Sequence, residues 1–299
     1  MNKVYNIINN YVLIGVGEFS HGINESWMFR FNLLKYVIKY TTKNIIIFNE
    51  IANWQAMNII NNTYIDVKTN KFKKYQGIKY EHPMFTDDTK PPWGTLWQYC
   101  FHTNESPIYV KIIKYIRKHK NRITMIGIDN ETLARDYEMY TTIMNNLDKN
   151  KINFIWTHNS HIDSRKLDWF DYKWTKKQYP LLKYRCGYYL KKKFKNEYCI
   201  ILTQAYKGTI RFDSFCVGNA CETRIWLKNH IVRKFKYNAN TKYVSKSWKI
   251  YTIFDNDLIE FSNSYFKNTT YGECSIGNSN KWDYILFFPT VTSLDKLNL

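Results

Sequence analysis

The stretch YVLIGVGEFSHG, residues 11–22, decides how the rest of the sequence is interpreted. Its first half, Tyr11–Val16, is an apolar run of strand length, and such runs are typical of strands buried on both faces of a parallel sheet. Its second half, residues 17–22, places the carboxylate of Glu18 and the imidazole of His21 directly after that strand. A buried strand that ends in titratable side chains predicts a site at the carboxyl edge of a sheet.

Further apolar runs predict more strands, with helical patterns between them. The strands are expected at Ile45–Phe48, Ile123–Ile128, Ile152–Trp156, Tyr198–Leu202 and Tyr284–Phe288, and helices at Asn24–Thr41, Pro107–Lys118 and Leu133–Leu147. The first helix has an apolar stripe at helical spacing, formed by Trp27, Phe31, Leu34 and Ile38. The alternation predicts an α/β fold with a mainly parallel central β-sheet flanked by helices.

The length of 299 residues suits one α/β domain, 1–299. A polar segment around residues 63–93 interrupts the alternation, with a Lys-rich stretch and the sequence Lys90-Pro91-Pro92. Irregular segments of this length inside a compact domain are often functional. We therefore expect an insertion or lid there, short and partly helical or irregular.

Titratable side chains follow four of the predicted strands. Because the carboxyl ends of parallel strands meet at one edge of a sheet, we expect these side chains to converge. They are Glu18 and His21 after the first strand, Glu50 after the second, Asp129 after the third, and His158 and His161 after the fourth.

Arg30 lies beside the apolar stripe of the first helix, projecting between Leu34 and Val37. A buried guanidinium is costly unless it is paired and hydrogen-bonded. We therefore expect Arg30 to pair with a carboxylate at the strand ends, rather than to extend along the stripe into water.

The composition is that of a basic, aromatic-rich chain that can build a core. Lys plus Arg is 44 and Asp plus Glu is 25, giving a formal net charge of +19, and aromatics make up 18%. This aromatic content excludes a disordered chain. The six cysteines show no CxxC spacing, which argues against a zinc ribbon. With no bilayer-length apolar run and no signal sequence, we expect a soluble cytoplasmic protein without membrane contact.

The positive excess is interpreted mainly as compositional bias, because the chain is visibly rich in Asn, Ile, Lys and Tyr. The lack of a recognisable nucleic-acid motif argues against a nucleic-acid partner. A polyanion-binding protein remains the alternative, on the strength of Lys173–Lys177, Lys191–Lys193 and the interleaved Tyr and Trp residues.

These motifs resemble those of the erythromycin esterase-like family. Residues 14–22, with Glu25 and with Arg30 nine positions after His21, resemble the family's opening strand, Gly-Glu-x-x-His turn and helix. Residues 46–50 resemble its second strand and glutamate, and residues 127–129 with 134–136 its third strand and following helix. Residues 154–161 resemble its Trp-x-His-Asn-x-His segment, with weaker similarity at 208–212 and 282–292.

The resemblance implies an antibiotic-resistance-related fold and an esterase: a hydrolase that uses activated water on a small-molecule ester, classically a macrolide lactone, without a cofactor. It implies His21 as general base, a role for which the pKa of histidine is suited. A second histidine or the arginine would stabilise the oxyanion. The remaining catalytic residues that it implies are Glu18, Glu50, Arg30, His158 and His161.

Alternatives to this interpretation remain. No Gly-x-Ser-x-Gly elbow is present, and Ser20 is disfavoured as a nucleophile because neighbours in a turn point apart. Carboxylates and histidines also bind divalent metals, but these loops lack the specific HExxH spacing, so no metal is predicted. The span 51–122 is shorter than the helical part that the family would place there. A different ester substrate, or an inactive descendant of the fold, therefore also fits the sequence.

Overall fold

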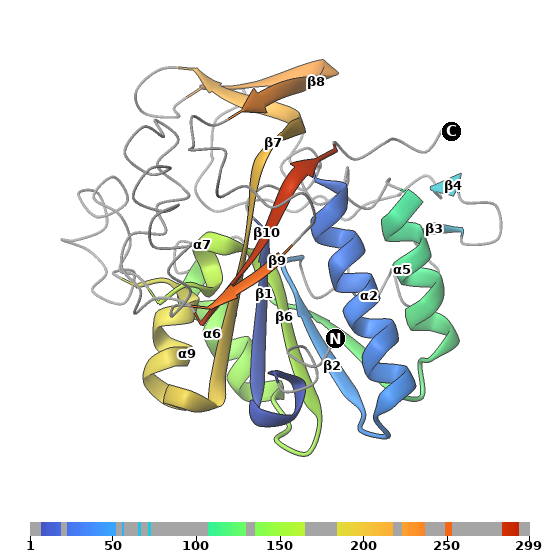
Figure 1. Ribbon diagram of the computed structural model, residues 1–299, viewed down its shortest axis with the longest axis vertical. Coiled ribbons are helices and arrows are strands. Elements are labelled where there is room, and N and C mark those ends of the chain that lie inside the picture. The colour runs from blue at the N-terminus through green and yellow to red at the C-terminus, as the bar shows by residue number, and fades with distance from the viewer. Residues whose placement is uncertain are drawn as a thin grey trace, which may run out of the picture.

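The computed structural model describes residues 7–18, 23–51, 56, 65–66, 71–72, 107–129, 135–164, 184–217, 223–236, 249–252 and 283–292. Among these residues, one eight-stranded sheet has the order β5-β2-β6-β1-β7-β10-β9, with β8 paired to β7 (Figure 1). The six strands from β5 to β10 in this order are parallel, while β9 and β8 are antiparallel to their neighbours. The mainly parallel α/β fold is thus confirmed.

The strands of this sheet extend over β1 (Leu13–Glu18), β2 (Ile45–Asn49), β5 (Ile123–Gly127), β6 (Ile152–His158), β7 (Tyr198–Val217), β8 (Thr223–Lys236), β9 (Lys249–Thr252) and β10 (Tyr284–Val291). A separate two-stranded sheet pairs β3 (Ile65–Asp66) with β4 (Lys71–Phe72). The helices are α2 (Asn24–Tyr40), α5 (Pro107–Lys118), α6 (Arg135–Asn146), α7 (Asn159–Ile162) and α9 (Cys186–Phe194), with a 3₁₀ turn at Lys195–Glu197. None of the helices that the structure describes has the length and apolar character needed to cross a bilayer.

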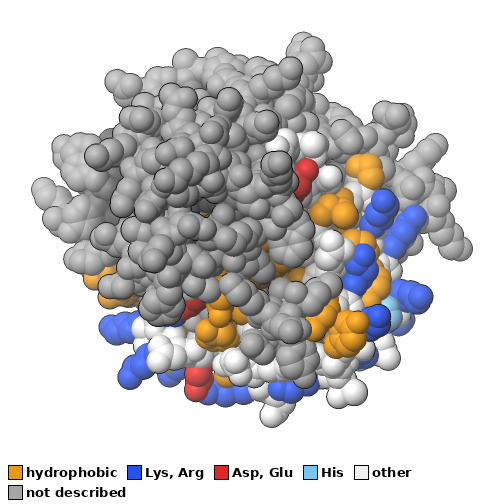
Figure 2. Space-filling view, in the orientation of Figure 1, with side chains coloured by type: hydrophobic (Ala, Val, Ile, Leu, Met, Phe, Trp, Pro, Cys, Tyr) orange, Lys and Arg blue, Asp and Glu red, His pale blue; other side chains and the backbone are white. Residues whose placement is uncertain are grey.

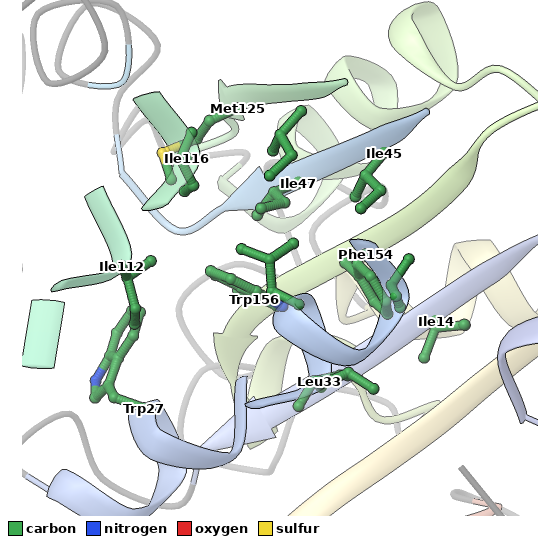
Figure 3. Packing of buried hydrophobic residues seen from close by; sticks show 14 of the residues in the cluster. Ile14, Trp27, Leu33, Ile45, Ile47, Ile112, Ile116, Met125, Phe154 and Trp156 are labelled. Atoms are coloured by element: carbon green, nitrogen blue, oxygen red, sulfur yellow. The ribbon is translucent and has the colours of Figure 1, made fainter. Parts of the chain in front are cut away.

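Helices cover the sheet on two faces, with α2 and α5 on one and α6, α7 and α9 on the other (Figure 1). Every residue of β1, β2 and β6 is buried, because each strand packs against both layers. In β2, Ile45 and Ile47 join the core under α2 and α5, whereas Ile46 and Phe48 join the opposite core. Figure 3 shows the first of these cores, where Trp27 and Trp156 lie among aliphatic side chains.

The chain leaves neighbouring strands toward opposite faces. After β1 it enters α2, and after β6 it enters α7 on the other face. β1 and β6 are nevertheless adjacent and parallel, with Glu18 opposite His158 in register. This arrangement is a topological switch point, where open α/β sheets form a crevice beyond the carboxyl ends of the strands.

The structure confirms most of the expected elements and corrects some. Pro107–Lys118 is helical with the expected bounds, and each expected strand is present with its ends moved by a few residues, except that β7 continues to Val217. Strands β8 and β9 were not predicted. The expected insertion around residues 63–93 lies mostly outside the described residues, and the single-domain assignment stays a prediction.

The four residues of the expected apolar stripe of α2 all lie in or against the core, but to different depths. Trp27 and Leu34 are buried as expected, but Phe31 and Ile38 are only partly buried. Phe31 instead lies at the edge of the helix, where its ring meets Tyr115 of α5 edge to face, with 5.5 Å between centroids. The remaining buried positions of the helix are Ser26, Arg30, Leu33 and Val37.

Candidate functional site at the carboxyl ends of the strands

A charged cluster lies at the carboxyl ends of β1, β2, β5 and β6. The register places Glu18 beside His158, and Asn49 between Trp156 and Gly127. The chain directly after β2 stays attached to this edge, because the backbone N–H of Glu50 donates to the carbonyl of Trp156 at 3.0 Å. The sheet pairing therefore brings together side chains that are more than 100 positions apart in sequence.

Arg30 joins α2 to the ends of β1 and β6. Its side chain is fully buried, and Nη2 donates to the carbonyls of Val16 and Thr157, each at 2.8 Å. Nη1 lies 3.3 Å from Oε2 of Glu18, so the expected pairing with a strand-end carboxylate is confirmed. Burial lowers the pKa of Arg30, and the charge of Glu18 acts against this shift. The guanidinium also lies over the ring of Trp27, 4.5 Å from its centroid.

The carboxylate of Glu50 contacts three donor groups, two of them by hydrogen bonds and the third as an ion pair. Its Oε1 lies 2.7 Å from Nη2 of Arg135 and 3.2 Å from Nε2 of His161. Its Oε2 accepts from the backbone N–H of His158 at 2.6 Å. The carboxylate is buried, and these charge-assisted contacts compensate for its removal from water.

Arg135, the first residue of α6, binds a second carboxylate at the end of β5. Its Nε donates to Oδ1 of Asp129 at 2.9 Å, and its Nη2 donates to the other oxygen of that carboxylate. Burial alone would lower the pKa of Arg135, but the carboxylates of Asp129 and Glu50 outweigh it and raise that pKa. The guanidinium therefore stays charged and neutralises two acids at neighbouring strand ends.

His161 lies between two carboxylates. Its Nδ1 is 2.9 Å from Oδ1 of Asp136, opposite the contact of Nε2 with Glu50. Burial alone would lower the pKa of His161, but the two carboxylates raise it to about 9. Asp136 in turn accepts from the backbone N–H of Cys186 at 2.8 Å and lies 3.5 Å from Arg185. This part of the site therefore links α6, α7 and α9.

His158 ends β6 and caps the N-terminus of α7. Its Nδ1 accepts from the backbone N–H of Ser160 at 3.3 Å and lies 2.8 Å from the hydroxyl of the same residue. With Nδ1 acting as the acceptor, the proton of a neutral His158 ring lies on Nε2. The neighbouring His161, by contrast, directs both of its ring nitrogens toward carboxylates.

The short helix α7 is held close to β1 and β7, which sets the positions of both histidines. Asn159 exchanges two hydrogen bonds with the backbone of Thr203, at 2.8 and 3.1 Å. A Cβ atom on Gly17 would lie 2.2 Å from Oδ1 of Asn159, so this position needs glycine for the helix to approach the strand. A Cβ on Gly187 would lie 2.0 Å from the carbonyl oxygen of Ile162, which gives the same requirement where α9 crosses α7.

The structure brings together five of the six side chains that the sequence nominated: Glu18, Arg30, Glu50, His158 and His161. The sixth, His21, lies outside the described residues, as does Ser20. Glu25 of the opening motif lies elsewhere: its carboxylate accepts from the backbone N–H and the hydroxyl of Thr292, at 2.8 and 2.7 Å.

Sequence reasoning missed Arg135, Asp136 and Arg185 as members of the site. A signal was present, because Arg135 and Asp136 follow the third strand in the segment that resembles the family. Within the described part of the chain, no group of three or more His, Cys, Asp or Glu side chains is arranged to hold a metal ion. Both ring nitrogens of His161 face carboxylates instead.

Comparison with known proteins identifies one family over part of the chain. The family model for erythromycin esterase matches residues 109–226. This segment includes His158 and His161, while Glu18, Arg30 and Glu50 precede it. Among curated protein sequences, none matches the chain significantly.

Solved structures share the fold along nearly the whole chain. A succinoglycan biosynthesis protein is 12% identical with a TM-score of 0.61, covering 98% of this chain and 91% of that one. A Bacillus cereus protein is 11% identical with a TM-score of 0.58, covering 99% and 92%. An erythromycin esterase mutant in its open conformation is also 11% identical with a TM-score of 0.58, covering 100% and 95%. At such identities the likeness shows the fold alone.

Proposed function

We propose that this chain, which matches the erythromycin esterase family model over residues 109–226 and shares the fold of an erythromycin esterase, is a hydrolase of ester bonds. In this proposal, water activated by a histidine attacks the carbonyl carbon of an ester or lactone. The family points to hydrolase chemistry, and the argument for this chain comes from its own side chains.

One observation carries the proposal: Glu50, buried after β2, binds His161, Arg135 and the backbone of His158 at the same time. Carboxylates and cations held in fixed positions at a topological switch point are typical of a preorganised polar site. The cost of burying such groups is hard to explain by stability alone, because apolar replacements of buried ion pairs are often as stable. We therefore infer that the cluster serves chemistry.

His21 is the proposed general base, from its place three residues after Glu18 in the opening motif. Water forms a bond to the carbonyl carbon while its proton passes to the imidazole. The tetrahedral intermediate then releases the alcohol, which takes up that proton as the carbon–oxygen bond breaks. No covalent enzyme intermediate is needed, and a base with a pKa near neutrality suits the step.

His158 and the cations of the site are proposed to stabilise the developing negative charge. In its neutral form His158 carries its proton on Nε2, because Nδ1 accepts from Ser160, and an N–H donor of this kind suits an oxyanion. Arg30 cannot take this part directly, since its side chain is fully buried against Glu18 and two backbone carbonyls. Its proposed role is to hold the ends of β1 and β6 in register.

The proposed substrate is a small-molecule ester, with macrolide lactones as one member of the class. One structural neighbour is an erythromycin esterase, which supports the ester class at the level of fold. The residues between β2 and α5 are too few for the helical part that the family resemblance implies, so the panel of substrates must extend beyond macrolides.

The test is hydrolysis by wild type and His21→Ala of a panel containing erythromycin, simple p-nitrophenyl esters and small lactones. We expect His21→Ala to lose about 100- to 10,000-fold in kcat with an unchanged melting temperature. His119→Ala is the matched control, because His119 precedes β5 at the opposite edge of the sheet, and it should keep full activity. Equal rates for wild type and His21→Ala, or no turnover of any ester by wild type, would overturn the proposal.

A second candidate function, polyanion binding, is favoured by one observation. The α2–α5 layer carries many cations, while residues 26–48 and 107–128 contain no Asp or Glu. Figure 2 shows Lys and Arg side chains gathered on this side of the molecule. The exposed lysines of the two helices are Lys35, Lys39, Lys111, Lys114 and Lys118.

The discriminating measurement is a titration with duplex DNA at several salt concentrations. Neutralisation of phosphates would make the affinity fall steeply as salt rises. A flat dependence, or no binding at low salt, would remove this candidate.

A further inference from the structure

Asp136 has no part in the function proposed above, yet it contacts His161 of α7 as well as Arg185 and the backbone of Cys186 at the start of α9. We propose that Asp136 is a positioning residue that keeps His161 a cation throughout the reaction and thereby fixes Glu50 and His158. The effect of Asp136 on catalysis rests on the proposed hydrolase function. Its effect on the protonation of His161 does not depend on any substrate.

Geometry supplies the first step. Nδ1 of His161 lies 2.9 Å from Asp136, and Nε2 lies 3.2 Å from Glu50. A carboxylate only accepts hydrogen bonds, so only an imidazolium, with a proton on each ring nitrogen, presents an N–H group to both carboxylates. A neutral imidazole has a single N–H and would leave one nitrogen lone pair facing a carboxylate. The ring is only 6% exposed, so water cannot relieve that repulsion easily.

The charged groups that face His161 also favour its doubly protonated, positively charged form. From α6 come Asp136 and the opposing charge of Arg135, and from the end of β2 comes Glu50. From the start of α9, Arg185 and the backbone N–H of Cys186 bind Asp136. Burial alone would raise the pKa of Asp136, but the charge and hydrogen bond of His161, together with these two contacts, lower it. Burial raises the pKa of the Cys186 thiol, so that group stays neutral.

The cation acts on the catalytic residues through Glu50. The Oε1 atom of Glu50 binds His161 and Arg135, and its Oε2 binds the backbone N–H of His158. Loss of the proton from His161 would release one of these contacts and let the Glu50 carboxylate rotate. The chain of contacts from Asp136 through His161 and Glu50 thus sets where His158 lies. A ring committed to two carboxylates is poorly placed to exchange protons with water.

If Asp136 had a purely architectural role, a different result would be expected for the protonation of His161. If Asp136 only joins α6 to α9 through Cys186 and Arg185, its charge has no effect on the protonation of His161. Asp136→Asn separates the two, because the amide oxygen can still accept from the Cys186 N–H while the negative charge is lost. Asp136→Glu keeps the charge and serves as the conservative variant.

The test reads the ring directly, by NMR of ¹⁵N-histidine-labelled protein over pH 6 to 10. His161→Gln assigns the signal among the seven histidines of the chain. In wild type we expect both ring nitrogens of His161 to be protonated at pH 7.5, with a midpoint at about 9. Asp136→Asn should lower that midpoint by about 1 to 3 pH units, and Asp136→Glu should largely preserve it. The control Asp148→Asn removes a surface carboxylate paired with Lys151 and should leave it unchanged.

A neutral His161 in wild type at pH 7.5, or a midpoint unaffected by Asp136→Asn, would overturn the proposal. Neither result depends on turnover, so failure here is distinguishable from failure of the hydrolase assignment. For an ester that wild type hydrolyses, the alkaline limb of kcat/KM should move to lower pH in Asp136→Asn by the same amount as the NMR midpoint. A uniform loss at every pH would instead indicate the purely architectural role.

Discussion

Both helical layers send arginines to the carboxyl ends of the strands, and two of these, Arg30 and Arg135, differ in their surroundings. Arg30, from the α2–α5 layer, is fully buried and binds two backbone carbonyls as well as Glu18. Arg135, from the α6–α9 layer, is 37% exposed, and its partners within the described residues are the carboxylates of Asp129 and Glu50. The first arginine is part of the core, and the second belongs to the rim of the site.

The two layers contribute differently: the α2–α5 layer contributes to the stability of the core, and the α6–α9 layer to the electrostatics of the site. On the α2–α5 side, Trp27 meets Tyr109 and Trp156 edge to face. The guanidinium of Arg30 lies over the rings of Trp27 and Trp156. The α6–α9 side instead holds its charges in a connected network around Glu50. We therefore expect changes on the first side to act mainly on folding, and changes on the second to act mainly on the state of the site.

The largest expected effect is on the core arginine. Arg30→Met removes the ion pair with the buried Glu18 and two hydrogen bonds to backbone carbonyls of β1 and β6, so it should lower the free energy of unfolding by about 3–5 kcal/mol. Urea denaturation measures this loss. Adding Glu18→Gln to Arg30→Met should recover part of it, because the buried charge is then gone. Lys35→Met, on the exposed face of α2, is the control and should change stability by less than about 0.5 kcal/mol. If Arg30→Met were as stable as wild type, Arg30 would not be a stabilising part of the core, and its contrast with Arg135 would be wrong.

The next effect concerns pH and tests the network side. The pKa of His161 is about 9 in the folded protein, above its ordinary value of 6.5. Its stabilising contribution is therefore fully present below about pH 6.5 and is lost as the pH rises through 9, by at most about 3 kcal/mol. Urea denaturation between pH 6 and 10 measures the decline.

His161→Gln should flatten that decline, because no imidazolium remains to be deprotonated. His119→Gln is the control: the pKa of His119 is lowered by burial and by Lys118, so any contribution from it changes below pH 6.5 and the slope between pH 7 and 9 should persist. Equal slopes in wild type and His161→Gln would contradict the charge state assigned to His161.

The smallest expected effect is on the rim arginine. Arg135→Met leaves two carboxylates without this partner, but water reaches a side chain that is 37% exposed and can replace part of its contacts. We expect a loss of about 1–2 kcal/mol, measured by the same urea assay. If Arg135→Met lowered the free energy of unfolding as much as Arg30→Met does, the two arginines would contribute equally to stability, which would contradict the contrast.

The six parallel strands could be predicted because each contains a short apolar run with a polar end. The helix Pro107–Lys118 was predicted with its bounds, since its apolar positions recur at helical spacing. The pairing of Arg30 followed from the cost of burying an unpaired guanidinium. The length of β7 could not be predicted from the apolar run alone, because the run stops at Leu202 while the hydrogen-bonded ladder continues to Val217.

The role of Arg135 and Asp136 was hidden in the sequence for a different reason. An acid in the first turn of a helix is ordinarily interpreted as compensating the helix dipole. Only the crossing of the chain from β5 back over β2 to β6 places the start of α6 beside Glu50 and His161. Contacts of this kind depend on strand order, which local patterns do not contain.

The sequence by itself determined the α/β class, the positions of the six parallel strands, and the acids and histidines that follow four of them. Burial preferences and periodicity are local properties, so they can be read from neighbouring residues. The tertiary structure decided which of these side chains meet and what charge they carry. His161 is a cation because Asp136 and Glu50, 25 and 111 positions before it, face its two nitrogens in a buried space. That proximity is a product of the strand order β5-β2-β6-β1, and the low exposure of the ring makes the resulting electrostatic interaction strong.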